Sequence, residues 1–86
     1  MAAKTIHKPE YKELLKLLRE MREAAKLTQT ELGDLISLSQ PTISAIERGG
    51  RRLDALEMRN FCKACGQDPS RFMKRYEKAI AAWPLP

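Results

Sequence analysis

The stretch that decides the fold is residues 27–49, which read LTQTELGDLISLSQPTISAIERG. Thr28 precedes Glu31 by three residues, and this spacing is typical of a capping box, in which the two residues exchange side-chain-to-backbone hydrogen bonds at the start of a helix. Ser39 is a second candidate N-cap, because a proline follows it at a position tolerated in a first helical turn. The stretch therefore predicts two short helices, over residues 28–36 and 39–48.

The link between these two helices is very short. Only Ser37 and Leu38 separate them, and a link of this length makes the helices cross steeply, as in a helix-turn-helix. In the second helix Ile43 and Ile46 are expected to face inward, together with Leu32, Leu35 and Ile36 of the first helix. The opposite face of the second helix is small or polar, and consists of Gln40, Pro41, Ser44, Ala45 and Arg48. Such a narrow face fits a DNA major groove about 12 Å wide, whereas the alternative is an ordinary solvated helix face.

Three further helices are predicted on the same grounds, over residues 9–25, 54–65 and 68–82. Asp54 and Glu57 form a second capping box, and Asp68 is an N-cap in front of a proline. Gly49 and Gly66 are expected to end the third and fourth helices in a left-handed conformation. No stretch alternates apolar and polar residues as a half-buried strand does. The sequence thus predicts an all-α, compact five-helix bundle that forms one domain over residues 1–86, with an arm at 1–8, a helical core at 9–83 and a tail at 84–86.

The composition excludes several classes of protein. The chain has 86 residues, of which 43% are hydrophobic and 31% are charged, and this balance is typical of a folded domain rather than a disordered one. Its formal net charge of +5 fits a polyanionic partner such as nucleic acid, or simply a solvated basic surface. The first eight residues contain no apolar run, so we expect no signal peptide, and no segment approaches the roughly 20 apolar residues that span a bilayer. We therefore expect a cytoplasmic protein without membrane contact, associated with the nucleoid when it is bound to DNA.

The two cysteines raise the question of a metal or redox site. Cys62 and Cys65 form a C-x-x-C pair, but a structural zinc site needs four ligands, and the one histidine, His7, is distant in sequence. A redox pair would normally follow a strand. Both cysteines instead continue an apolar stripe with Met58 and Phe61, and we expect them to be reduced core residues. Because the sequence has no nucleophile–base set and no phosphate-binding glycine loop, we expect no enzymatic activity, no metal and no cofactor.

The central stretch also resembles a known family. LTQTELG at 27–33 and LSQPTISAIERG at 38–49 are similar to the helix-turn-helix of phage-repressor and Cro-type regulators, the lambda-repressor-like or xenobiotic-response-element class. The similarity covers about residues 14–80, and it implies a five-helix DNA-binding domain. Three residues depart from the family's usual pattern: Gly33 replaces an alanine, Ser37 replaces a turn glycine, and Leu53 replaces a proline.

The resemblance and the positions in the predicted helices together imply residue roles. The base-contacting candidates are Gln40, Pro41, Ser44 and Ala45. Gln40 is the leading base reader, because a glutamine amide can pair bidentately with adenine. The phosphate-contacting candidates are Gln29, Thr42, Arg48, Arg51 and Arg52. The three arginines follow the recognition helix, so we expect them to set affinity and salt dependence rather than sequence choice, unless they are ordinary solvated side chains.

The resemblance also pairs Arg22, late in the first helix, with Glu47 at the end of the third helix. A bidentate, partly buried pair would fasten the recognition helix to the rest of the domain. The alternative is two exposed charges, which would contribute only about 0–1 kcal/mol.

The last predicted helix carries an apolar stripe at three- or four-residue spacing, made by Phe72, Tyr76, Ile80 and Trp83. We expect this stripe to be more apolar area than so small a domain buries alone, and exposed apolar area often marks an interface. The sequence therefore predicts a homodimer whose interface includes this helix. A monomer with a slightly long last helix is the alternative.

Two classes of function fit these patterns. The first is a transcriptional regulator that binds a double-stranded DNA operator, either a repressor or an antitoxin-type autoregulator with a toxin or other protein partner. The second is a protein-interaction module on the same fold, without specific DNA binding. A partner-binding surface should carry large apolar or aromatic anchors on the third helix, and their absence there favours DNA.

Overall fold

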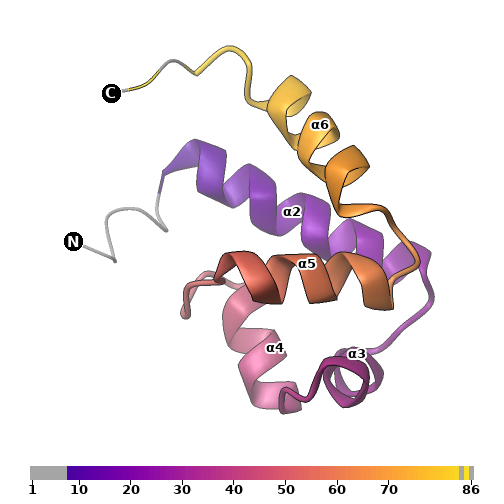
Figure 1. Ribbon diagram of the computed structural model, residues 1–86. Helices are drawn as coiled ribbons and strands as arrows, with labels where there is room; N and C mark the ends of the chain where they lie inside the picture. Colours follow the sequence, from indigo (N-terminus) through magenta and orange to yellow (C-terminus); the bar gives the residue numbers. More distant parts are fainter. Residues whose placement is uncertain (1–7, 84, 86) are drawn as a thin grey trace.

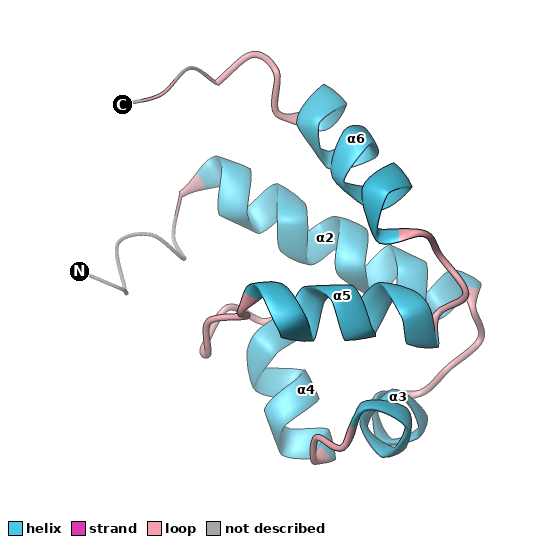
Figure 2. Cartoon of the chain, viewed as in Figure 1, coloured by secondary structure: helices cyan, strands magenta, loops and turns pink. Residues whose placement is uncertain are grey.

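The computed structural model describes residues 8–83 and 85, so residues 1–7 of the predicted arm, His7 among them, and the tail residues Pro84 and Pro86 lie outside the described residues. Within the described range the chain forms five helices and no strand (Figure 1, Figure 2). They are α2 (Pro9–Ala24), α3 (Gln29–Ile36), α4 (Gln40–Glu47), α5 (Ala55–Ala64) and α6 (Pro69–Ala79). The predicted all-α bundle is confirmed, and α3 and α4 lie at the opposite end of the molecule from α6, with α2 and α5 between them (Figure 1).

The predicted capping residues determine where the helices begin. The Thr28 N–H donates to Glu31 Oε1 at 2.9 Å, and the Glu31 N–H donates back to Thr28 Oγ1 at 3.0 Å, so this capping box is confirmed. The box of Asp54 and Glu57 before α5 is confirmed in the same way, with distances of 3.1 and 2.7 Å. Ser39 Oγ accepts from a backbone N–H in the first turn of α4. Each cap stabilises its helix by about 1 kcal/mol and fixes its first residue.

The turn between α3 and α4 depends on two residues that depart from the family pattern. Ser37 adopts a left-handed conformation with φ +61° and ψ +40°, at a cost that a glycine would not have. Gly33 leaves room for the turn, because a Cβ atom there would overlap the backbone oxygen of Leu38. The Leu38 N–H in turn donates to the Gly33 carbonyl at 2.9 Å. The atoms nearest to a Cβ at Gly33 therefore belong to the turn backbone at Leu38. The nearest atom of α4 lies farther away and belongs to the Ile43 side chain.

All five described helices contribute side chains to one core. Its buried residues are Leu14, Leu15, Leu18, Met21, Leu32, Ile43, Ile46, Phe61, Cys62, Cys65 and Phe72. Leu35, which was expected to face inward, is instead 61% exposed. Within a helix as short as α3, Leu32 and Ile36 already define the side that meets α4 and α5, and Leu35 falls beyond its edge.

The last helix is shorter than the sequence suggested. α6 ends at Ala79 rather than at residue 82, and the Trp83 N–H closes a turn onto the Ile80 carbonyl at 2.9 Å. Trp83 directly precedes a proline in the sequence, and a residue in that position is biased away from helical backbone angles. Trp83 therefore follows the helix instead of extending its apolar stripe.

Half of the predicted interface stripe belongs to the protein's own core. Phe72 is only 2% exposed, so the expectation that it lines a dimer contact is wrong. Tyr76 packs against the core, and its hydroxyl donates to the Glu10 carbonyl at 2.7 Å. These side chains close the gap between α6 and α2, and of the stripe only Phe72 is fully buried, whereas Tyr76 and Ile80 are half-buried and Trp83 is exposed.

Candidate nucleic-acid interface

The two faces of α4 differ as the sequence predicted. Ile43 and Ile46 are fully buried against the core, whereas Gln40 and Pro41 are exposed at the start of the helix. Ser44, on the same outer side, is half-buried, as is Ala45. The helix therefore presents a polar, small-residue face at one end of the molecule, beside α3 (Figure 1).

A chain of hydrogen bonds runs from the scaffold to the start of this face. Arg22 Nε donates to Glu47 Oε2 at 2.7 Å, and Arg22 Nη2 donates to Glu47 Oε1 at 3.0 Å. The Gln29 amide nitrogen donates to the same Glu47 Oε1 at 3.0 Å, and the Gln29 amide oxygen accepts from the Gln40 amide nitrogen at 2.8 Å. Residues of α2, α3 and both ends of α4 are thus joined, and the side chain of Gln40 is held from behind.

The Arg22–Glu47 pair is largely withdrawn from solvent. The two side chains are 11% and 5% exposed. The third guanidinium nitrogen of Arg22, Nη1, donates to the Leu27 carbonyl at 2.8 Å. The hydrogen bond to Glu47 raises the pKa of Arg22 above its usual value, so the guanidinium stays charged. Arg22 therefore fastens both the end of α4 and the loop before α3.

The orientation of Gln40 leaves its base-reading groups available. One amide N–H is used by Gln29, which leaves a second N–H and the amide oxygen of an exposed side chain. An N–H donor and a C=O acceptor side by side match the N7 and N6 groups of adenine in the major groove. Gln29, by contrast, lies between Glu47 and Gln40, a bridging position that the sequence did not suggest.

The other candidates on α4 are engaged with one another. Arg48 Nη1 donates to Ser44 Oγ at 3.0 Å, so the arginine folds back along the outer face of the helix. Thr42 Oγ1 lies 2.8 Å from Ser39 Oγ, and its hydroxyl is part of the N-cap of α4. All of these hydroxyl groups lie at the surface, where a phosphate or base edge can exchange for the internal contact.

The arginines after α4 divide into two kinds. Arg51 forms a bidentate pair with Glu57, at 2.9 and 2.7 Å, and also donates to the Arg52 carbonyl. This contact, together with the hydrogen bond from Asp54, lowers the pKa of Glu57 below its usual value. Arg52 is exposed. The structure therefore ties Arg51 to the start of α5, a pairing across a loop that the sequence analysis missed, and leaves Arg52 as the better phosphate-contacting candidate.

The cysteines lie in the core. Burial raises the pKa of Cys65 to about 11 and raises that of Cys62 as well, so both remain neutral thiols near neutral pH. Within the described residues no three His, Cys, Asp or Glu side chains come together in a way that could hold a metal ion. The C-x-x-C spacing here reflects one buried helix face of α5.

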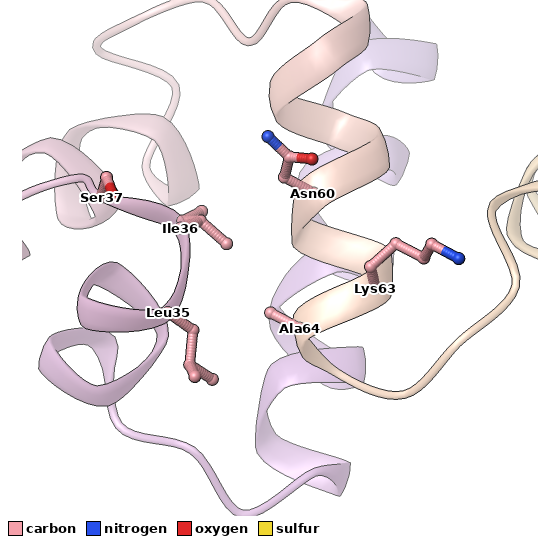
Figure 3. A pocket seen from close by; sticks show the side chains of 6 residues that line it. All are labelled: Leu35, Ile36, Ser37, Asn60, Lys63 and Ala64. Atoms are coloured by element: carbon pink, nitrogen blue, oxygen red, sulfur yellow. The ribbon is translucent and has the colours of Figure 1, made fainter.

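A separate hollow of about 430 Å³ lies between the end of α3 and α5 (Figure 3). It is lined by Leu35, Ile36, Ser37, Asn60, Lys63 and Ala64. The close-up shows that Ile36 points toward α5, whereas Leu35 points along the gap between the two helices (Figure 3). The hollow thus offers packing area beside the turn, whereas the Lys63 ammonium group points away from α3 (Figure 3).

Comparisons with known proteins agree with this geometry. A family model described as a helix-turn-helix domain matches residues 13–72, and the chain therefore belongs to the helix-turn-helix domain family. A solved structure of an XRE-family like protein from Pseudomonas syringae pv. tomato is similar over 91% of this chain and 95% of that one, with 41% identity and a TM-score of 0.80. No curated protein shows a significant match. The chain is thus a DNA-binding regulator of the lambda-repressor-like, or XRE, type. Within its described residues no helix has the length and apolar character needed to span a bilayer.

Proposed function

We propose that this protein is a sequence-specific transcriptional regulator, a repressor or an antitoxin-type autoregulator, that reads an operator by placing α4 in the major groove. The observation that carries the proposal is the exposed amide of Gln40, oriented by Gln29 and, through Glu47 and Arg22, by the scaffold. A reading group that is already held in place loses little conformational entropy on binding. A side chain held in this way favours sequence discrimination, and an ordinary solvated helix face would have no need of it.

In this proposal some side chains on and around α4 contact bases and others contact phosphates. Gln40 reads adenine, Ser44 contacts a base edge, and Pro41 and Ala45 offer apolar contact to a thymine methyl. The phosphate contacts are Gln29, Thr42, Arg48 and Arg52. Arg51 is assigned instead to the loop, because Glu57 already occupies its guanidinium.

We also propose that the regulator acts as a homodimer, in which the end of α6 takes part. Trp83 is 43% exposed and Leu85 is 94% exposed, so apolar area remains at this end of the molecule after the core is complete. A two-fold dimer would place its α4 helices in successive major grooves, about 34–36 Å apart. Size-exclusion chromatography with light scattering at micromolar concentration tests this, and Trp83→Ser should shift the protein toward monomer.

The proposed function is tested by selecting bound duplexes from a random pool and then measuring affinity at several salt concentrations. A regulator should return a short, two-fold symmetric site. Gln40→Ala should relax the preference at one base position by about 1–3 kcal/mol, because one bidentate contact is lost. Arg52→Ala should weaken binding to every sequence alike and make the salt slope less steep by about 1.

The competing function is a protein-interaction module in which the same fold binds another protein. It would be favoured if the selection returned no preferred site, and if Leu35→Ser, in the hollow beside α5, abolished capture of a partner while Gln40→Ala did not. Equal behaviour of Gln40→Ala and Arg52→Ala on DNA would contradict the division between reading and holding residues.

A further inference from the structure

A second basic surface lies on α2, beside the end of α4. A hollow of about 250 Å³ between α2 and the end of α4 is lined by Lys12, Leu15, Lys16, Arg19, Glu47 and Arg48. Four of these six residues carry a positive charge. The three from α2 recur at four- and three-residue spacing, so they form one row along that helix, and all three are exposed.

No ion pair among the described residues involves the row. Glu47 is the one acidic residue that lines the hollow, and its carboxylate is already paired with Arg22. The ion pairs among the described residues are those of Arg22 with Glu47 and of Arg51 with Glu57, so neither involves the row. Along α2 the row ends at Arg19, because Glu23 occupies the next turn on that side.

We propose that Lys12, Lys16 and Arg19 form a second phosphate-contacting row, which holds the DNA backbone that flanks the base pairs read by α4. The inference rests on the proposed function and adds a binding surface to it. Arg48 connects the two surfaces, because it lies along the outer face of α4 and also lines the hollow that the row borders.

The dimensions of the row fit a nucleic-acid strand. From the first to the last of the three residues, α2 rises about 10 Å at 1.5 Å per residue. Phosphates of one strand recur about every 3.4 Å along the duplex axis, so the row spans about three of them. Long, flexible lysine side chains suit contacts that need charge but no fixed geometry, and such contacts carry no sequence information.

The row is also continuous with the loop after α4. Tyr11, next to Lys12 in the chain, accepts a hydrogen bond at its hydroxyl oxygen from the Leu53 N–H at 3.2 Å. The start of α2 is therefore held beside the loop that carries Arg52. A strand that leaves α4 past Arg48 and this loop would next meet the row.

The test compares two triple variants on the selected site. K12Q/K16Q/R19Q removes the row, and R71Q/K74Q/K78Q removes two lysines and one arginine, all exposed, from α6, the helix at the opposite end of the molecule from α4 (Figure 1). Both lower the net charge equally, and glutamine is a good helix former. The first should make the salt slope less steep by about 2–3 and weaken binding at 0.1 M salt by at least tenfold, whereas the second should change the slope by less than about 1.

Circular dichroism shows whether each variant is folded. A second measurement compares the wild-type protein with the variants on DNA sites of different flank length. Removing base pairs that flank the selected site should weaken binding of the wild-type protein and leave K12Q/K16Q/R19Q almost unaffected. If the two triple variants change the slope equally, or if flank length matters equally to all proteins, the row makes no contact and the inference fails alone. If the wild-type protein selects no site, the proposed function fails and the row fails with it.

Discussion

The part of the chain that the structure describes contains two bidentate Arg–Glu pairs, and their surroundings give them different roles. Arg22 and Glu47 join α2 to the end of α4, and their side chains are 11% and 5% exposed. Arg51 and Glu57 join a loop to the first turn of α5, and their side chains are 40% and 17% exposed. The pairs have the same chemistry and similar distances. Because only the Arg22–Glu47 pair is largely buried and shares its atoms with hydrogen bonds to Leu27 and Gln29, we expect only this pair to hold α4 in place.

The largest effect is expected from breaking the buried Arg22–Glu47 pair, the inner pair. Arg22→Met leaves the Glu47 carboxylate in a nearly dry site with Gln29 as its remaining donor, and loss of one partner of a buried pair costs about 3–5 kcal/mol. Urea unfolding followed by circular dichroism measures this loss. A loss below about 1 kcal/mol would mean that the inner pair contributes no more to stability than a surface pair does.

A double variant separates stability from positioning. Arg22→Met with Glu47→Met replaces both charges by apolar side chains, and such replacements are often neutral or stabilising, so stability should return to within about 1–2 kcal/mol of the wild type. Gln29 loses its acceptor in this variant, and Gln40 is then held less firmly. Discrimination at the base position assigned to Gln40 should fall severalfold although the protein is stable. Full discrimination in the double variant would show that the hydrogen-bond chain does not position Gln40.

The sequence was most informative where structure depends on near neighbours. A capping box requires only that Thr28 and Glu31, or Asp54 and Glu57, stand three residues apart, so the helix starts could be predicted within one residue. Such features are set within one helical turn and need no knowledge of the tertiary fold.

The sequence was less informative where two distant segments have to meet. Leu35 and Phe72 are both apolar residues at helical spacing, yet one is exposed and the other buried, because α3 and α6 use only part of their apolar surface against their neighbours. The Arg51–Glu57 pair forms across a loop whose path is not encoded in any periodic pattern. The bridging role of Gln29 likewise depends on the crossing of α3 over α4. In each case the tertiary arrangement decides between side chains that look equivalent in the sequence.

A smaller effect is expected from breaking the partly exposed Arg51–Glu57 pair, the outer pair. Arg51→Met should cost about 1 kcal/mol or less, because a partly exposed pair gains little over its hydration. It should leave base preference and the salt slope unchanged, since Glu57 rather than a phosphate holds this guanidinium. Arg52→Met, at the neighbouring exposed position, is the matched control and should reduce the salt slope by about 1. A change in slope for both variants would return Arg51 to the phosphate-contacting set.

The smallest effect is a pH dependence confined to the outer pair. The folded protein holds the pKa of Glu57 below its usual value of 4.5, chiefly through the hydrogen bonds from Arg51, so this stabilisation is present above pH 4.5 and is lost as the pH falls through the lowered pKa. Glu57→Gln keeps an oxygen that can accept from the Asp54 N–H but carries no charge at any pH. The stability difference between wild type and Glu57→Gln, measured by urea unfolding, should therefore be of order 1 kcal/mol at pH 7 and shrink steadily below pH 4.5. All other carboxylates are common to both proteins and cancel in the difference, so a difference that stays constant down to pH 2 would show that the charge of Glu57 contributes nothing to the outer pair.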